Sequence, residues 1–261
     1  MEKSKSLMRI YCWNVNGIRA VQKKGFLSWF REVSPDVLCL QETKAHQDQL
    51  EKALVEVEGY ESLWSSAERK GYSGVGTYTR RRPLSFQYGF GKTEFDSEGR
   101  VLVTEFPEFM LFNVYFPNGK RDQVRLDFKL EFYRAILQHW QDLRKKGKRL
   151  VICGDYNTAH KEIDLARPKE NETISGFLPI EREWMDELVR LGYVDTFRLF
   201  NQKPDQYTWW DMMTRARERN VGWRIDYFFV SQDLIPMVKQ ACICPQVMGS
   251  DHCPIGLELE L

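Results

Sequence analysis

The segment of residues 151–157, Val-Ile-Cys-Gly-Asp-Tyr-Asn, constrains the fold more than any other part of the chain. Its apolar residues form a run of the length of a buried strand, and Gly154 ends that run. Side chains two residues apart point the same way in an extended backbone. Asp155 and Asn157 are therefore predicted to face one cleft at the edge of a sheet.

Two interpretations of this pair are open on the segment alone. A carboxylate can take a proton from water, and a carboxamide beside it can fix a donor or an acceptor. Asp and Asn also bond to their own backbone, however, and a plain Asx turn after a strand would use the same two residues. The segment by itself favours the turn, so the decision depends on the rest of the chain.

Length, composition and charge limit the kinds of protein that this chain can be. It has 261 residues, enough for one large domain or two small ones, and its 8 Trp, 11 Tyr and 16 Phe supply a sizeable core. No linker or low-complexity tract divides it, so we expect one domain over residues 1–261. The formal net charge is +1, so nucleic-acid binding would require positive charge concentrated on one face.

The cysteines favour a reducing compartment. Cys12, Cys39 and Cys153 lie inside apolar runs, where cysteine behaves as a small buried hydrophobe. Cys242 and Cys244 have no second Cys or His pair to complete a zinc site. With no signal peptide and no apolar run long enough to span a membrane, we expect a cytoplasmic monomer that does not contact membranes.

The order of apolar runs and turn residues predicts a mixed α/β chain. The predicted strands are residues 7–13, 37–40, 60–64, 74–79, 84–88, 101–105, 110–115, 151–155, 207–210, 225–230, 241–244 and 255–261. The predicted helices are residues 25–33, 48–57, 123–145 and 181–191, and residues 157–177 are predicted to be a long polar loop. The two halves repeat the order strand, helix, strands, which favours two sheets packed face to face with helices outside.

Polar residues suited to a metal or a phosphate mark the ends of six predicted strands. They are Asn14 with Asn16, Glu42, Tyr115 with Asn118, Asp155 with Asn157, Asp226, and Asp251 with His252. One such strand end is ordinary, but six are harder to explain by turn chemistry alone, because ligands gather at strand ends in layered folds. Oxygen ligands with few carboxylates suit magnesium or manganese better than zinc.

Short motifs run through the whole chain in a fixed order. They are Trp-Asn-Val-Asn-Gly-Ile-Arg-Ala (13–20), Leu-Gln-Glu-Thr-Lys (40–44), Tyr-Ser-Gly-Val (72–75), Asn-Val-Tyr-Phe-Pro-Asn (113–118), Gly-Asp-Tyr-Asn (154–157), Ser-Gly-Phe-Leu-Pro (175–179), Tyr-Thr-Trp-Trp (207–210), Gly-Trp-Arg-Ile-Asp-Tyr (222–227) and Gly-Ser-Asp-His-Cys-Pro (249–254). In this order they resemble the exonuclease III family of abasic-site endonucleases, most closely its archaeal members.

The resemblance implies a fold, a reaction and a cofactor. The fold is a four-layer αββα sandwich, with two mixed β-sheets between outer helices as in deoxyribonuclease I. The reaction is cleavage of the phosphodiester 5′ to an abasic site in duplex DNA, leaving a 3′-hydroxyl and a 5′-deoxyribose phosphate, with 3′–5′ exonuclease activity beside it. Mg²⁺, or Mn²⁺ as a substitute, would be bound by Glu42 in a region lined by Asn14, Asn16 and Asp251. Some members carry Asp where this chain has Asn16, which leaves the number of metal ions open.

The same resemblance assigns roles to the reacting groups. Asp155 would orient or deprotonate the attacking water, and Asn157 would hold Asp155 and the scissile phosphate. His252, paired with Asp226, would donate to a nonbridging phosphate oxygen, and Tyr115 would add a further hydrogen bond. These are preplaced donors and a cation that stabilise charge on the phosphate. Whether Asp155 is the general base, and whether Tyr115 protonates the leaving group, stays open.

The remaining matched positions concern DNA. Trp209, Trp223 and Ile225 resemble an apolar pocket for a flipped-out sugar, although aromatic residues at such positions can also be core. Met213 resembles a residue that wedges into the base stack. Contacts to phosphates are expected from Asn171, Arg19, Lys23, Lys24, Lys44, Tyr72, Arg100 and Arg215. Residues 125–129 resemble archaeal members, which suggests nicking at deoxyuridine with Lys129 reaching the DNA; the alternative for Lys129 is a solvated helix residue.

Three other functions compete with this interpretation. They are a phosphoesterase for inositol phosphates or sphingolipids, a non-catalytic DNA-binding module, and a general nuclease with no preference for lesions. The motifs around Trp209 and Trp223 argue against the first. The presence of Glu42, Asp155 and His252 argues against the second, because a module without activity would be expected to have lost at least one of them.

Overall fold

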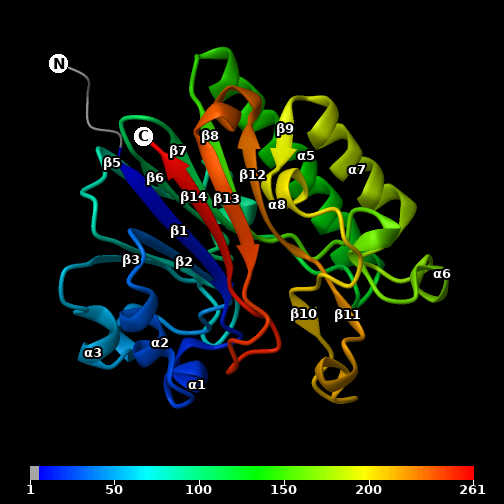
Figure 1. The fold of residues 1–261 in the computed structure, drawn as a ribbon, viewed down its shortest axis with the longest axis horizontal. Coiled ribbons are helices and arrows are strands. Elements are labelled where there is room, and N and C mark those ends of the chain that lie inside the picture. The colour runs from blue at the N-terminus through cyan, green and yellow to red at the C-terminus, as the bar shows by residue number, and fades with distance from the viewer. Residues whose placement is uncertain (1–5) are drawn as a thin grey trace.

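Two six-stranded β-sheets pack face to face, and a two-stranded ribbon lies beyond one end of them (Figure 1). The computed structural model describes residues 6–261. In spatial order, the first sheet comprises β13 (Val238–Ile243), β14 (Ile255–Glu260), β1 (Leu7–Asn14), β2 (Val37–Gln41), β4 (Val75–Thr79) and β3 (Glu61–Ser65). The second comprises β5 (Ser85–Tyr88), β6 (Val101–Glu105), β7 (Met110–Tyr115), β8 (Leu150–Asp155), β12 (Asp226–Ser231) and β9 (Tyr193–Asp195). The ribbon is formed by β10 (Trp209–Trp210) and β11 (Gly222–Trp223).

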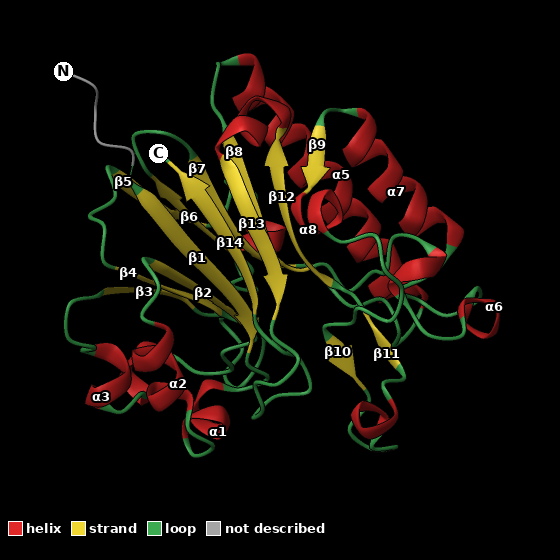
Figure 2. Cartoon of the chain, in the orientation of Figure 1, coloured by secondary structure: helices red, strands yellow, loops and turns green. Residues whose placement is uncertain are grey.

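Helices lie against the outer face of each sheet (Figure 2). The α-helices are α1 (Ile18–Gln22), α2 (Phe26–Val33), α3 (Lys52–Val55), α4 (Thr93–Asp96), α5 (Gln123–Lys145), α6 (Pro168–Asn171), α7 (Pro179–Arg190) and α8 (Thr196–Phe200). The 3₁₀ helices are η1 (Gln47–Gln49), η2 (Glu162–Asp164), η3 (Ala216–Arg219) and η4 (Gln232–Met237). α1, α2 and α3 pack on the first sheet, and α5 and α7 pack on the second. The β1–β2 and β7–β8 pairs are parallel and the other strand pairs of both sheets are antiparallel, so the predicted arrangement of two mixed sheets between outer helices is confirmed.

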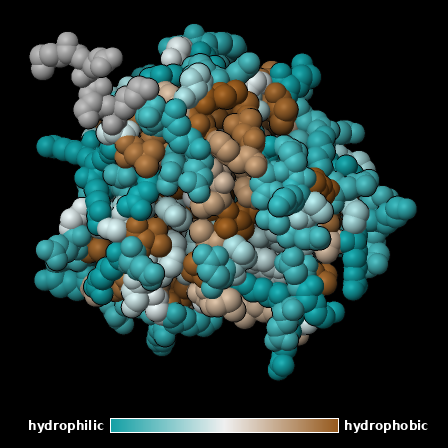
Figure 3. All heavy atoms as spheres, viewed as in Figure 1, coloured by the Kyte–Doolittle hydropathy of each residue, from teal (hydrophilic) through white to brown (hydrophobic). Residues whose placement is uncertain are grey.

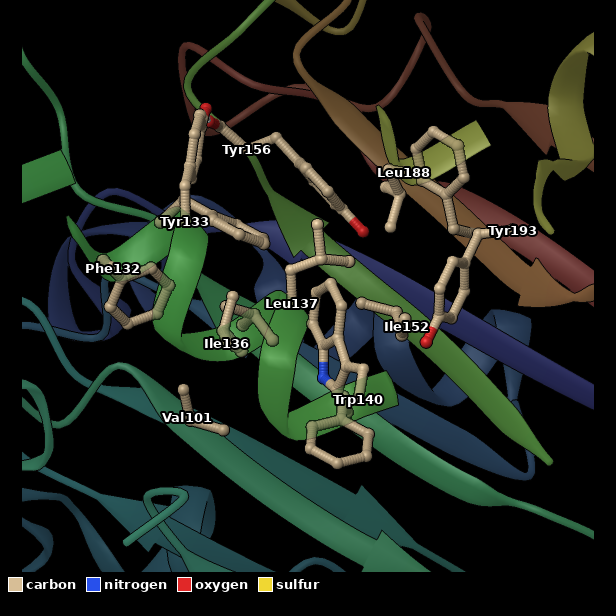
Figure 4. Close-up of a cluster of buried hydrophobic side chains, with 14 of the residues drawn as sticks. Val101, Phe132, Tyr133, Ile136, Leu137, Trp140, Ile152, Tyr156, Leu188 and Tyr193 are labelled. Atoms are coloured by element: carbon tan, nitrogen blue, oxygen red, sulfur yellow. Dashed lines mark hydrogen bonds between the residues drawn. The ribbon is translucent and has the colours of Figure 1, made fainter. Parts of the chain in front are cut away.

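The central strands are apolar on both faces because each sheet is covered on both sides. Along β8, Val151 and Cys153 face the other sheet, where they meet Ile10 and Cys12 of β1. The alternate residue Ile152 faces outward into the cluster under α5 and α7. Figure 4 shows side chains of that cluster, many of them from α5, gathered around Ile152. This two-sided burial explains why the strand reads as a continuous apolar run in the sequence.

The longest helix has the bounds that the sequence predicts, because both of its ends are encoded locally. The Asp122 side chain accepts a hydrogen bond from the Arg125 N–H at 2.8 Å and caps the first turn. At the other end, Gly147 follows the last turn with a φ of 76°, a conformation that glycine adopts at little cost. The buried side chains of α5 lie one helical turn apart, as the apolar spacing requires.

Two predicted elements differ from the structure. The helix expected over residues 48–57 is wrong: only η1 and α3 form, and the chain is extended at Leu50 and Glu51 between them. The extended link lets Leu50 and Leu54 both reach the cluster beneath the first sheet. The loop expected over residues 157–177 contains η2 and α6, and the chain after α7 forms β9 and α8, which the sequence did not suggest.

A buried ion pair corrects the prediction for Lys129. This lysine of α5 has 0% exposure, so it neither reaches DNA nor is solvated. Its Nζ donates to Glu181 Oε1 at 2.6 Å, to the Asn157 carbonyl at 2.8 Å and to Thr158 Oγ1 at 2.8 Å. Glu181 in turn accepts from the N–H of Leu178 at the start of α7. Through this ion pair, Lys129 of α5 links the residues that follow β8 to the first turn of α7.

Replacing Lys129 by Met should destabilise the protein, because it leaves the Glu181 carboxylate buried without its counter-charge. Removing one partner of a buried ion pair costs roughly 3–5 kcal/mol of unfolding free energy. Urea denaturation would measure this against Lys146→Met, which removes an exposed lysine at the end of α5. Adding Glu181→Gln to Lys129→Met should recover part of the loss. Equal stability of Lys129→Met and wild type would contradict the assigned ion pair.

Candidate active site

A cleft of about 360 Å³ opens where the central strands of both sheets end. It is lined by Asn16, Glu42, Lys44, Tyr115, Asn118, Lys120, Asp155, Asn157, Gly176, Trp209, Trp223, Ile225, Asp251 and His252. Most of the residues that the sequence singled out as catalytic, metal-binding or sugar-binding are thus brought together. Asn14 and Asp226 lie directly beneath, with exposures of 0% and 3%.

Gly154 sets the position of Asp155 at the base of this cleft. A Cβ atom at Gly154 would lie 1.7 Å from the Val114 carbonyl oxygen of the neighbouring strand, and its φ of 149° is one that other residues rarely adopt. Only glycine lets β8 approach β7 this closely. The last residue of β8, Asp155, then stands at the edge of the sheet beside Tyr115, the last residue of β7.

The Asx turn and the predicted catalytic pair are formed by the same two residues. Asp155 Oδ1 accepts a hydrogen bond from the Asn157 N–H at 2.8 Å, which is the turn, and Asn157 has a left-handed φ of 51°. The other oxygen, Oδ2, accepts from Asn14 Nδ2 at 2.8 Å and from Asn157 Nδ2 at 3.3 Å. One carboxylate oxygen thus holds the loop, and the other lies among donors from both sheets.

A second carboxylate and an imidazole complete the base of the cleft. The antiparallel register pairs Asp226 of β12 with Asp155 of β8. His252 Nδ1 lies 2.8 Å from Asp226 Oδ2, and its Nε2 lies 3.8 Å from Asp155 Oδ2. Thr208 donates from its hydroxyl to Asp226 Oδ2 at 2.6 Å, which fixes the carboxylate that holds the imidazole. The predicted pairing of His252 with Asp226 is present.

Burial and mutual charge shift the titration of these groups. Burial raises the pKa of the Asp155 carboxyl to about 7, and repulsion from Asp226 adds to the effect while His252 opposes it. Burial alone would lower the pKa of His252, but the carboxylates of Asp226 and Asp155 outweigh it and raise the pKa to about 10. At neutral pH His252 is therefore an imidazolium, a hydrogen-bond donor rather than a base. Burial also raises the pKa of Tyr115 well above its usual value, so its phenol keeps its proton.

Oxygen atoms beside this group converge on a position that takes a cation. Lys44 Nζ lies 3.0 Å from Glu42 Oε1 and 2.5 Å from Asn16 Oδ1. Asn16 Nδ2 donates to Asp251 Oδ1 at 2.9 Å, so Asp251 stands behind Asn16. The ammonium occupies the kind of oxygen-lined position that suits a hard divalent ion. Glu42, Asn16 and Asp251 therefore fit the predicted metal region.

Asn14 lies beneath this region and donates hydrogen bonds to two of its carboxylates. Its Oδ1 accepts from the Asn16 N–H at 2.9 Å, and its Nδ2 donates to Glu42 Oε2 at 3.1 Å as well as to Asp155. A second possible metal position exists among the described residues, where ligand atoms of Asp155, Asp226 and His252 lie within 4.8 Å of one another. There the imidazolium of His252 already supplies positive charge.

An aromatic pocket adjoins the charged groups. Trp209 and Trp223 pair across the β10–β11 ribbon, with ring centroids 6.4 Å apart and planes at 85°. Ile225 lies in the same cluster and is 7% exposed. Trp209 Nε1 donates to Asp251 Oδ2 at 3.0 Å, which joins the pocket to the metal region. The two indoles are only partly buried, so they are a cleft wall and not core alone.

The predicted DNA contacts are distributed around the cleft. Met213 is 93% exposed beyond the ribbon, and Lys24 and Arg215 line a neighbouring hollow of about 280 Å³. Arg19 and Lys23 are exposed on and just after α1. These positions suit contacts to a long, charged partner.

Five of the predicted contacts have polar partners within the protein: Lys24, Lys44, Tyr72, Arg100 and Asn171. Arg100 is 2% exposed, and its guanidinium binds Glu98 Oε2 at 2.6 Å and the Tyr72 hydroxyl at 2.8 Å. It holds Tyr72 in a hollow of about 590 Å³ and does not offer a free charge, which corrects the expected phosphate contact. Asn171 donates to the Arg167 carbonyl at 2.9 Å within α6 and does not line the cleft.

Sequence reasoning missed two residues of the site. Thr208 stands inside a quoted motif, but nothing in a lone threonine indicates that it bonds to an aspartate 18 positions away. Lys120 follows the motif that ends in Asn118, and its Nζ lies 4.9 Å from the ring centroid of Trp209 and 5.2 Å from that of Trp223. A cation next to a motif was the available signal, but its indole partners come from a distant segment.

The chain belongs to the endonuclease/exonuclease/phosphatase family, which matches residues 12–252. An exodeoxyribonuclease of Bacillus subtilis is 42% identical over 97% of this chain and 100% of its own length. A DNA repair nuclease of Danio rerio is 46% identical over 97% of this chain and 82% of its own length. The resemblance to exonuclease III-type enzymes drawn from the motifs is thereby confirmed.

Solved structures agree with this assignment. A 3′ phosphatase from Neisseria bound to a product DNA hairpin has a TM-score of 0.89 and 27% identity, covering 97% of this chain and 100% of that one. An AP endonuclease from the archaeon Archaeoglobus fulgidus has a TM-score of 0.88 and 26% identity, with the same coverage. The four-layer sandwich is thus shared along nearly the whole chain.

We expect Asp226→Asn to lower the pKa of His252 by roughly one to three pH units, since it removes the carboxylate that stabilises the imidazolium. Imidazole ¹⁵N NMR of the metal-free protein would follow the titration, with Asp142→Asn on exposed α5 as the matched control. In wild type the stabilisation from protonated His252 is complete below its ordinary pKa of 6.5 and is lost as the pH rises through about 10. A titration midpoint of wild-type His252 near pH 6.5 would contradict the assigned ion pair with Asp226.

Proposed function

We propose that the protein is a Mg²⁺-dependent DNA repair endonuclease that cleaves the phosphodiester 5′ to abasic sites in duplex DNA. The products would be a 3′-hydroxyl and a 5′-deoxyribose phosphate, with residues 1–261 acting as one catalytic domain. The observation that carries this proposal is a single cleft in which Asp155 and His252 adjoin a pocket walled by Trp209 and Trp223. The names of the relatives, an exodeoxyribonuclease and a DNA repair nuclease, support it.

Asp155 would remove a proton from the attacking water. Its pKa near neutrality suits a general base, and Asn14 and Asn157 hold its Oδ2 in place. His252, protonated between two carboxylates, would donate to a nonbridging phosphate oxygen, where negative charge grows in the transition state. Tyr115, with its proton retained, would add a second donor or protonate the leaving oxygen.

Glu42, Asn16 and Asp251 would hold the divalent ion. When bound, Mg²⁺ or its substitute Mn²⁺ would supply positive charge that neutralises the phosphate. The ammonium of Lys44 lies 3.0 Å from Glu42 Oε1, so it would lie next to the bound ion. Because this chain has Asn16 where a carboxylate would add negative charge, a single ion is the simpler arrangement.

The two indoles and Ile225 would receive the base-less sugar. Such a sugar is small and apolar on its faces, and a normal nucleotide carries a base that this pocket would exclude. Extruding a nucleotide costs least where no base stacks or pairs. Met213, exposed beyond the ribbon, would wedge into the stack, and the exposed cations around the cleft would bind phosphates. The net charge of +1 is compatible with this role, because Arg19, Lys23, Lys24 and Arg215 are all exposed.

Removal of nucleotides or phosphates from 3′ ends is a second activity that the same cleft would support. One solved neighbour is a 3′ phosphatase bound to a product DNA hairpin, and another is a 3′–5′ exonuclease. Endonuclease and 3′-end activities would differ only in which phosphate group of the DNA the donors bind. Nicking at deoxyuridine is left out of the proposal, because Lys129, on which it rested, is fully buried.

Asp155→Asn should abolish nicking of a duplex with one abasic site while leaving DNA affinity nearly unchanged, because affinity comes mainly from cations on phosphates. Glu42→Ala should raise the Mg²⁺ concentration needed for nicking or abolish it. The measurements are single-turnover nicking with identification of the 3′ end, and binding by anisotropy. Asp142→Asn, on the exposed face of α5, is the matched control. The proposal would be contradicted if wild type were fully active in EDTA, or if Asp155→Asn nicked the duplex at the wild-type rate.

Trp223→Ala should relax the preference for abasic over intact DNA before it destroys the chemistry. The substitution removes one aromatic wall of the pocket and leaves Asp155 and His252 in place, while lost apolar contact should weaken abasic binding. The ratio of nicking rates on abasic and intact duplexes is compared with wild type. An unchanged ratio in folded protein would mean that Trp223 is only core and that selectivity lies elsewhere.

A further inference from the structure

A primary amine stands in the mouth of the aromatic pocket. The Nζ of Lys120 lies 4.9 Å and 5.2 Å from the ring centroids of Trp209 and Trp223, over the two walls of the cleft. The other lysine that lines this cleft, Lys44, binds Glu42 and Asn16. Among the lysines of the described chain that line this cleft, Lys120 is the one directed at the indoles.

The loop that carries Lys120 is held close to the pocket. The Lys120 N–H donates to Asn118 Oδ1 at 2.8 Å, and the Asn118 amide donates to Asn157 Oδ1 at 2.9 Å. A Cβ atom at Gly119 would lie 2.6 Å from Ser175 Oγ, so this part of the loop fits tightly against the neighbouring segment. The backbone of the lysine is thus positioned from both sides.

The surroundings also favour amine chemistry. The residue as a whole is exposed, but the partial burial of its tip lowers the pKa of the Lys120 ammonium, although Asp155, Glu181 and Asp211 oppose that effect. A lowered pKa increases the fraction of neutral amine, which is the nucleophilic form. The faces of indole rings donate no hydrogen bond to the lone pair of the neutral amine. The nitrogen is therefore available to an electrophile that enters the pocket.

An abasic sugar brings such an electrophile. Without its base, the deoxyribose interconverts between a closed hemiacetal and an open chain that ends in an aldehyde. The tetrahydrofuran analogue of the same lesion has no aldehyde. Lysine amines react with carbonyl groups to form imines, and burial between apolar walls is a recurrent way to prepare them.

We propose that Lys120 forms a covalent imine with the aldehyde of a ring-opened abasic sugar held between Trp209 and Trp223. This inference rests on the proposed function, because it needs the sugar in that pocket. The amine nitrogen attacks the carbonyl carbon and forms a C–N bond; the carbonyl oxygen leaves as water with the two protons from the nitrogen. No oxidant or reductant takes part, and hydrolysis reverses the bond. The pocket therefore holds the lesion by reversible chemistry as well as by shape.

Reductive trapping tests the imine. The protein is incubated in EDTA, which prevents metal-dependent nicking, with a duplex bearing a natural abasic site and sodium cyanoborohydride, which reduces an imine to a stable secondary amine. Wild type should give a protein–DNA adduct on a denaturing gel, and peptide mapping should locate it on Lys120. Lys120→Arg keeps the positive charge but forms no stable imine, so the adduct should be lost. Thermal unfolding verifies that the variant is folded.

Two controls separate this inference from the proposed function. Lys146→Arg, at the far end of α5, should trap as wild type does. A tetrahydrofuran duplex should be nicked by wild type in Mg²⁺ but should give no adduct. An adduct that persists in folded Lys120→Arg, that maps to another lysine, or that never forms although wild type nicks both duplexes would overturn the imine alone. Failure of wild type to nick either duplex would instead overturn the proposed function.

Discussion

A hydrogen bond between the two sheets organises the rest of the site. Asn14, the last residue of β1, donates to Asp155, the last residue of β8, across the interface at 2.8 Å. Deeper in the same interface, Gln41 donates to Asn113 at 2.7 Å, again from one sheet to the other. Polar contacts buried among apolar layers are costly unless they are satisfied, so they allow only one relative position of the sheets. A shift of either sheet would separate the carboxylate from its donors.

Charge in the cleft is arranged as a chain of alternating signs. The cationic His252 lies between two carboxylates, those of Asp226 and Asp155. The next carboxylate, that of Glu42, is paired with the Lys44 ammonium. Each buried charge has an opposite neighbour, which is the condition for keeping charges in a low-dielectric interior.

Among the described residues, no helix is long and apolar enough to cross a membrane. Much of the face in Figure 3 is hydrophilic, with hydrophobic residues toward its middle.

The sequence predicted what depends on local order and left out what depends on distant partners. The two sheets, the bounds of α5 and the gathering of polar strand ends at one cleft follow from short apolar runs, from the helical spacing of apolar residues and from the polar residues that end the strands. The burial of Lys129 does not, because its partner Glu181 is 52 positions away and an isolated lysine on a helix reads as solvated. The break at Leu50 was missed because the helical spacing of apolar residues continues through it. For Asp155 and Asn157, turn and catalytic pair were opposed in the sequence, yet each carboxylate oxygen serves one of them.

The turn at the end of β8 occurs a second time at the end of β1. In both, the first side chain accepts from the N–H two residues later, at 2.9 Å for Asn14 and 2.8 Å for Asp155, and the second residue, Asn16 or Asn157, is left-handed. The site is thus built from two copies of one Asx turn, whose first side chains meet across the interface between the sheets. Besides the middle residue, Val15 or Tyr156, the copies differ by a single terminal atom of the first side chain, an amide nitrogen in Asn14 and an oxygen in Asp155. Exchanging that nitrogen for oxygen at Asn14 would set two carboxylates against each other over one proton, and the division between donor and base would vanish.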